Sequence, residues 1–254
     1  MKTKLSLASF LFMLYPFHLF AGEIIDLTHS FNEKTIFWPT EKGFELEKRG
    51  WKVTEKGYFY AANIFKMPEH GGTHIDAPIH FAKGRWTVDQ IPLEHLLGEA
   101  AVIDLRKKVG GNADTLISPE DITAWEKDNG NLSSRDIVLF NTGWSLFWGN
   151  KKKYLGTDKF GAVKNLHFPG LSAGAARLLV ERKVKGVGLD TPSLDYGQSE
   201  DFIAHRILLE KNIYGLENLD NLDKLPHRGS TLTVAPMKIE DGTGGPTRIY
   251  AFLP

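Results

Sequence analysis

Short apolar runs alternate with amphipathic segments along most of the chain. The apolar runs are rich in β-branched or aromatic residues and are bounded by turn-forming residues, a pattern typical of strands. We predict strands at residues 24–28, 101–105, 136–140, 184–189 and 247–252. Strands separated by helical segments indicate an α/β domain.

Helix start signals lie between these strands. Ser118 precedes a proline and two acidic residues, which is typical of a capped first turn, and predicts a helix continuing over residues 122–127. Ser172 caps a predicted helix over residues 173–183, and Ser199 begins a third that runs to about residue 211. With no repeat, low-complexity segment or linker in view, we expect one domain.

The N-terminus differs from the rest of the chain. A cationic stretch at residues 1–4 precedes a mostly apolar run at 5–14, and the segment ends at Ala21 before polar residues begin. This layout is typical of a secretory signal peptide. A spanning helix is the alternative, but the run is short and is interrupted by Pro16 and His18. We therefore predict a signal peptide at 1–21, a mature domain at 22–254, export to the periplasm or the medium, and no stable membrane anchor after cleavage.

Composition narrows the possible chemistry. The 31 basic residues balance the 31 acidic residues, and no segment is basic enough to indicate a nucleic-acid partner. The chain has no cysteine, which excludes disulfides, thiolate metal sites and cysteine nucleophiles. Any metal must be held by histidine, aspartate, glutamate or backbone oxygen.

Three of the nine histidines fall within residues 70–80, which read HGGTHIDAPIH. In an extended chain the period of two places His74, Asp76 and His80 on one face. Pro78 argues against a central strand, so we expect an extended segment that borders a cleft. Gly71 and Gly72 allow the backbone to turn and His70 to join the same centre.

Two imidazoles and a carboxylate suit Zn²⁺, Mn²⁺ or Fe²⁺. Three protein ligands leave a position open for water, whose pKa the metal lowers, so the segment predicts a catalytic metal site. Ordinary hydrogen-bonded surface histidines are the alternative reading.

Three other patterns in the sequence bear on function. Residues 170–174 match the nucleophile elbow of serine hydrolases, but no strand precedes Ser172, and a helix cap explains this serine more simply. The glycine-rich residues 241–245 lack the lysine of a phosphate loop and indicate a turn. Phe37 and Trp38 are candidates to line a pocket for a flat substrate, with Tyr58 and Phe59 as weaker ones.

The 70–80 segment resembles the signature of the cyclase superfamily, which contains the bacterial kynurenine formamidases and the isatin hydrolases. The resemblance extends over nearly the whole mature chain, through residues 37–39, 188–195, 217–219, 222–226 and 244–246. The stretches 69–81 and 188–199 look closer to isatin hydrolase than to kynurenine formamidase.

The resemblance implies a swivelling β/β/α fold in a single domain, assembled as a homodimer or larger homo-oligomer. It implies that His70, His74 and Asp76 hold a first divalent ion, zinc or manganese. His205 and Glu217 complete a second site that Asp76 can bridge, so one or two ions bind per chain. His80 matches the general acid/base. From the residues alone, His205 on an apolar helix face is more typical of a core histidine.

The implied reaction is hydrolysis of an amide C–N bond in a small aromatic amide or cyclic amide. We expect an arylformamidase acting on an N-formylated aromatic amine. The first alternative is a hydrolase of isatin or of another cyclic amide or lactone. A non-catalytic metal- or ligand-binding protein is the alternative from a different class.

Overall fold

The computed structural model describes residues 22–254, and the predicted signal peptide at 1–21 lies outside the described residues. Among the helices of residues 22–254, none combines the length and the apolar character needed to cross a membrane.

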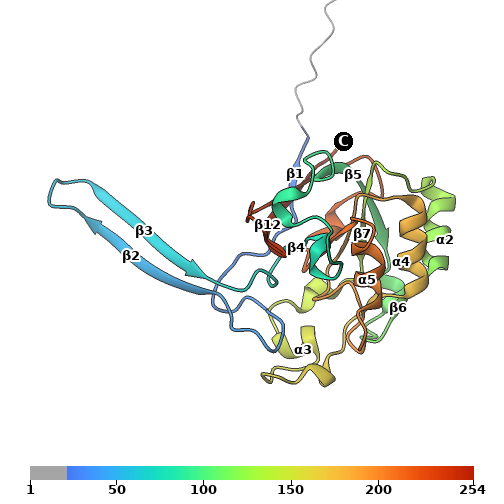
Figure 1. Cartoon of the computed structure of the whole chain (residues 1–254), viewed down its shortest axis with the longest axis horizontal. Coiled ribbons are helices and arrows are strands. Elements are labelled where there is room, and N and C mark those ends of the chain that lie inside the picture. The colour runs from blue at the N-terminus through green and yellow to red at the C-terminus, as the bar shows by residue number, and fades with distance from the viewer. Residues whose placement is uncertain (1–21) are drawn as a thin grey trace, which may run out of the picture.

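A closed, mixed β-sheet forms the centre of the molecule (Figure 1). Four neighbouring strands run parallel: β5 (Leu97–Asp104), β7 (Asp136–Asn141), β9 (Gly186–Leu189) and β10 (Tyr214–Glu217). Three antiparallel strands complete the circuit: β4 (His74–Asp76), β11 (Thr231–Pro236) and β12 (Gly244–Phe252). Because β4 pairs with both β10 and β12, the sheet closes into a barrel. The short β1 (Ile24–Asp26) pairs with the other end of β12.

Helices cover the parallel side of the barrel. α2 (Pro119–Asn129), α4 (Ala173–Arg182) and α5 (Ile203–Leu209) lie beside one another there (Figure 1). The remaining short elements are α1 (Arg106–Val109), α3 (Lys151–Leu155), the parallel pair β6 (Leu116–Ile117) and β8 (Gly170–Leu171), and 3₁₀ turns at Pro78–His80, Val88–Gln90, Trp144–Phe147, Val163–Asn165 and Leu222–Lys224.

Two apolar cores result from the period-two alternation of the strands. In β7, Val138 and Phe140 point toward the helices, whereas Ile137 and Leu139 point into the barrel. Both faces of the parallel strands are therefore buried, which explains their nearly continuous apolar sequence. The single α/β domain and the five predicted strands are confirmed, with ends shifted by a few residues.

The predicted helix caps have mixed outcomes. The Ser118 amide donates to Asp121 Oδ2 at 2.7 Å, and Ser172 Oγ accepts from the Ala175 amide at 3.2 Å, so the first two predictions are confirmed. The third was wrong at its start: α5 begins at Ile203, because Phe202 has φ 49° in the left-handed region. Ser199 Oγ accepts from the Phe202 amide and caps only a turn.

A long β-hairpin was not predicted from the sequence. Strands β2 (Glu45–Val53) and β3 (Phe59–Lys66) pair only with each other and project from the body (Figure 1). All but one of their residues are exposed.

Candidate metal centre

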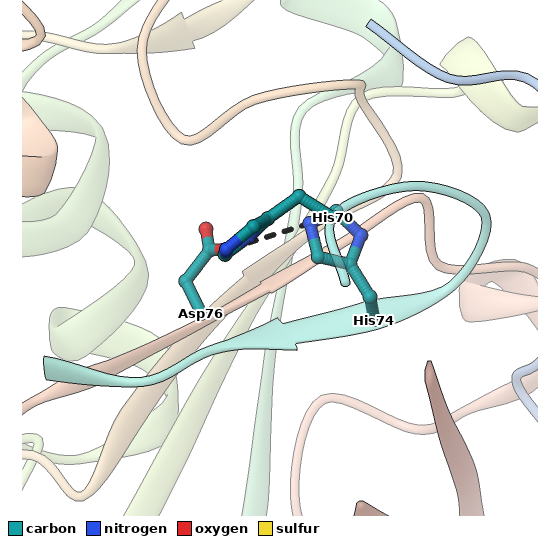
Figure 2. Close-up of side chains that lie close together, drawn as sticks. All are labelled: His70, His74 and Asp76. Atoms are coloured by element: carbon teal, nitrogen blue, oxygen red, sulfur yellow. Dashed lines mark hydrogen bonds and ion pairs between the residues drawn. The ribbon is translucent and has the colours of Figure 1, made fainter. Parts of the chain in front are cut away.

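The five predicted ligands come together from separate parts of the chain. β4 supplies His74 and Asp76, the loop before it supplies His70, and Figure 2 shows these three side chains converging. The neighbouring strand β10 supplies Glu217, directly opposite His74 in the antiparallel register. α5 supplies His205 from the helix layer. Potential ligand atoms form two groups, His70–His74–Asp76 and Asp76–His205–Glu217, each within 4.8 Å.

Asp76 belongs to both groups. Its Oδ1 lies 2.6 Å from His70 Nδ1 and 3.2 Å from His74 Nε2. Its Oδ2 lies 3.2 Å from His205 Nε2. Each oxygen therefore faces one group, which is the arrangement a carboxylate needs to bridge two cations.

Glu217 also faces both groups. Its Oε2 lies 3.4 Å from His74 Nε2, and its Oε1 lies 3.1 Å from His205 Nε2. The Leu194 amide donates to Oε1 at 3.0 Å and fixes the carboxylate. Burial, together with the nearby charge of Asp76, raises the pKa of Glu217. Two buried carboxylates this close require positive charge between them.

Hydrogen bonds aim the three imidazoles at these carboxylates. His74 Nδ1–H donates to the Gly72 carbonyl at 2.9 Å, and His205 Nδ1–H donates to Asp195 Oδ2 at 2.6 Å. In both residues Nε2 is left to face the centre. His70 faces it with Nδ1 instead, because its Nε2 lies 2.9 Å from Thr243 Oγ1. Such partners on the far ring nitrogen are typical of metal-binding histidines.

The nitrogen His74 Nε2 tests whether a cation fits. It is buried and has no hydrogen-bond partner among the described residues, yet it points at oxygens of Asp76 and Glu217. A lone pair facing two carboxylates is repelled unless a cation or proton lies between them. A set of imidazoles and carboxylates suits a borderline divalent metal. The donor set of the buried cluster therefore fits a divalent metal ion.

The same geometry governs proton binding. Burial lowers the pKa of His74, but the charge and hydrogen bond of Asp76 outweigh it and raise that pKa to about 9. Burial likewise opposes protonation of His205, but hydrogen bonds to Asp195, Asp76 and Glu217 hold its pKa well above the ordinary value. Burial tends to raise the pKa of Asp76, but the charge of His74 and hydrogen bonds from three histidines outweigh burial and hold that pKa well below the usual range. The centre therefore attracts cations.

His80 reaches the cavity in a different way from the one predicted. Period-two alternation ends at Asp76, and Pro78–His80 forms a 3₁₀ turn, so the shared-face argument was wrong for His80. The turn nevertheless stacks its imidazole on that of His70, with centroids 3.8 Å apart. His80 belongs to neither group of potential ligands. Burial lowers the pKa of His80 to about 3, so the imidazole is neutral at pH 7.

Two glycines allow the ligands to approach. Gly72 has φ 60°, and a Cβ there would lie 2.4 Å from the Phe31 ring. Gly244 of β12 pairs with Asp76, and a Cβ on it would lie 2.7 Å from His70 Cε1. Larger residues at either position would displace the chain that carries His70 and His74.

A cavity of about 390 Å³ opens onto the five predicted ligands. Its outer walls include the aromatic side chains of Phe37, Trp38, Phe81 and Phe202. Both predicted pocket residues therefore line it. Tyr58 and Phe59 do not, because they lie at the exposed end of the hairpin.

Sequence reasoning missed the residues that orient the ligands. Asp195 lies in a stretch that resembles the cyclase superfamily, and this was the only available signal for it. Glu69 accepts a hydrogen bond from Thr243 Oγ1 at 2.5 Å and extends the chain of contacts from His70. No local pattern marks Thr243, since it meets His70 only when the barrel closes.

Comparisons with known proteins agree with this geometry. The family model described as putative cyclase matches residues 25–196. An isatin hydrolase from Roseibium aggregatum is 35% identical over 206 residues, which cover 78% of this chain and 77% of the relative. A kynurenine formamidase from Bacillus cereus is 28% identical over 229 residues, covering 89% and 96%. The crystal structure of an isatin hydrolase bound to the product analogue thioisatinate superposes with a TM-score of 0.83 at 32% identity, covering 91% of this chain and 92% of that one.

Proposed function

The chain belongs to the cyclase family of metal-dependent hydrolases, and we propose that it opens a cyclic amide on a flat aromatic ring system, such as isatin. The observation that carries this proposal is the aromatic cavity that opens directly onto the buried cluster of imidazoles and carboxylates. The higher identity to an isatin hydrolase than to a kynurenine formamidase supports the cyclic amide over the N-formyl amine that we expected first.

The metal-binding roles follow from the two groups of donors. His70, His74 and Asp76 would hold one cation, and Asp76, His205 and Glu217 would hold a second. Zinc and manganese suit these donors. A bound divalent cation supplies a Lewis acid and lowers the pKa of water near the substrate carbonyl.

The protein's own side chains bind the substrate and move the proton. Phe37 and Trp38 offer apolar surface to a planar ring and exclude bulk water. His80 accepts a proton from the attacking water on an imidazole nitrogen and returns it to the leaving nitrogen. The water oxygen forms a bond to the carbonyl carbon, the C–N bond breaks, and the nitrogen leaves with the returned proton.

An arylformamidase activity is the second candidate. Kynurenine formamidases match a larger share of the chain, 89% in the Bacillus cereus relative, than the isatin hydrolase does. An N-formylated aromatic amine also presents a flat ring and an amide carbonyl, so the same cavity and His80 would serve it.

A paired assay separates these candidates. Residues 22–254, the proposed mature form, are purified, their zinc and manganese are measured by elemental analysis, and isatin and N-formylkynurenine are assayed side by side. We expect metal near stoichiometric amounts and a kcat/KM for isatin at least about tenfold higher, a transition-state difference of about 1.4 kcal/mol. The reverse order would establish the arylformamidase. Metal-loaded protein that hydrolyses neither compound would reject both as substrates, and inactivity extended to other aromatic cyclic amides and lactones would favour a non-catalytic binding protein.

A further inference from the structure

The cavity beside the predicted ligands is graded from a buried floor to an exposed mouth. Four of the five predicted ligands are buried, and they form the floor. Two further carboxylates line the same cavity: Glu69 is half-buried, and Glu41 is exposed to solvent. Glu41 and Glu69 therefore lie nearer the mouth than those four ligands, and we call them the mouth carboxylates.

Aromatic rings connect the floor to the mouth. The ring of Phe81 lies 4.8 Å from that of His205 and 5.3 Å from that of Phe202, measured between centroids. The ring of Phe202 lies 6.1 Å from that of Trp38. A flat substrate whose amide reaches the floor therefore lies along this wall, and its remote end points toward the mouth.

Local contacts hold the mouth carboxylates in place. The Glu41 amide donates to the Trp38 carbonyl at 2.9 Å, so Glu41 shares a tight turn with part of the aromatic wall. Glu69 Oε2 accepts from the amide and the hydroxyl of Thr243 at 3.1 and 2.5 Å. Within residues 22–254, no ion pair includes either mouth carboxylate. No cationic side chain there neutralises their charge.

The cavity also lacks a counter-ion for an anionic ligand group at its mouth. Neither lysine nor arginine is among the residues of 22–254 that line it, and Lys42, next to Glu41 in the sequence, is not a lining residue. Asp76 and Glu217 at the floor face the cations that they would hold, whereas the mouth carboxylates belong to neither group of potential ligands. The mouth therefore has an excess of negative charge, which acts on any charged molecule that enters.

We propose that the mouth of the cavity selects substrates by charge, with Glu41 and Glu69 as the specificity residues. The favoured substrates are aromatic amides whose remote end is uncharged or carries an amine, and a carboxylate or sulfonate at that end is rejected. Carboxylates attract an amine and repel an anion, and the faces of aromatic rings act in the same sense. This inference rests on the proposed function and narrows its substrate class.

Two pairs of substrates differ in charge at the remote end. Isatin-5-sulfonate is an anion, and isatin-5-sulfonamide is a neutral compound of nearly the same size. N-formylkynuramine lacks the α-carboxylate of N-formylkynurenine and keeps its amine. We expect metal-loaded residues 22–254 to favour the member without the anionic group at least about tenfold in kcat/KM, and the preference to weaken in about 0.5 M salt.

Substitution of the mouth carboxylates tests their part in this preference. The double variant Glu41→Gln/Glu69→Gln removes both charges at nearly constant volume, and an amide oxygen at position 69 still accepts from Thr243. Glu55→Gln is the matched control, because Glu55 lies in the turn of the projecting hairpin and does not line the cavity (Figure 1). We expect the double variant to reduce the preference at least about fivefold, chiefly through a lower KM for the anionic substrate, and the control to change it less than about twofold.

The preference is a ratio within each variant, so a general loss of activity or a difference in intrinsic reactivity cancels. Elemental analysis checks that the variants keep their metal. An unchanged preference in the double variant, with hydrolysis intact, overturns charge selection and leaves the proposed function standing. Hydrolysis of the N-formyl pair alone, with a preference that the double variant loses, replaces the cyclic amide and supports charge selection.

Binding measured by calorimetry decides the case in which no compound is hydrolysed. Tighter binding of the sulfonamide than of the sulfonate, lost in the double variant, supports charge selection although the proposed reaction fails. Equal affinities, or no binding of any of the four compounds, overturn the inference together with the proposed function.

Discussion

The Asp195 carboxylate orients the His205 imidazole so that Nε2 faces Asp76 and Glu217. Replacing Asp195 with asparagine removes one carboxylate oxygen from this contact with little change in side-chain volume. Asp195 is 1% exposed, and its two oxygens accept hydrogen bonds from different donors. Oδ1 accepts from the Ala204 amide at 2.8 Å, and Oδ2 accepts from the amide and the Nδ1–H of His205 at 3.1 and 2.6 Å. An asparagine has one oxygen, so either rotamer leaves an NH₂ group facing a donor.

The cost follows from the tautomer of His205. If the NH₂ group faces Nδ1, that nitrogen must give up its proton, and the proton moves to Nε2, the atom that points at Asp76 and Glu217. A protonated Nε2 cannot bind a cation. Loss of a partner on the far ring nitrogen typically weakens metal binding by about 10–100-fold, or roughly 1.4–2.8 kcal/mol.

Competition with a zinc-selective chelator measures this loss on residues 22–254. Asp114→Asn is the matched control, because Asp114 Oδ1 holds His167 Nδ1 at 2.8 Å in a carboxylate–histidine pair on the exposed surface. We expect the control to bind zinc like the wild type. A folded Asp195→Asn variant with undiminished zinc affinity would show that Asp195 does not orient a ligand.

Three further predictions concern turnover, metal removal and pH. His80→Ala should lower kcat at least about 100-fold while the metal content is unchanged, with the exposed His167→Ala as control. Removing the metal with a chelator should lower the unfolding temperature by roughly 10 °C, since a ligand at a thousand times its Kd contributes about 4 kcal/mol; an unchanged temperature in calorimetry would contradict a structural contribution of the ion. Burial lowers the pKa of His29 below the ordinary 6.5, and the charge of Asp220 partly offsets this shift. Just below pH 6.5, His29 is therefore protonated more in the unfolded chain than in the folded chain. The contribution of His29 to the unfolding free energy should therefore decrease as the pH falls below 6.5. In urea titrations of metal-free protein at pH 5, 6 and 7, the His29→Gln variant should gain stability relative to the wild type as the pH is lowered.

Local signals explain what was predicted correctly about the fold. The caps at Ser118 and Ser172 act within one helical turn, and the apolar run of β7 is buried on both sides wherever the strand lies. The left-handed Phe202 was not visible in the sequence, because nothing but its tertiary surroundings selects that conformation for a phenylalanine. The hairpin was missed for a related reason: the bulge at Trp51 interrupts the alternation that marks strands.

The residues of the site also fall into those that local sequence spacing predicts and those that it does not. His74 and Asp76 are two positions apart on one strand and therefore lie on one face. This relation depends only on neighbouring residues, so the sequence was enough to predict it. Pro78 was misinterpreted, because β4 is a central strand that ends just before it and the proline begins a 3₁₀ turn. His205 and Glu217 could be selected only through the family resemblance, since neither lies near the 70–80 segment in the sequence.

The closure of the barrel at β4 has a consequence for how the protein is made. β4 is bordered by β12, the last strand of the chain, and His70 meets Thr243 across 173 positions. A ribosome releases His70, His74 and Asp76 long before it releases the strand that shields them. The nascent chain therefore has ligands but no finished site, and contacts of such long sequence separation form late in folding. The completed site, with β12 beside β4 and Thr243 beside His70, can therefore form only after synthesis has reached the last strand.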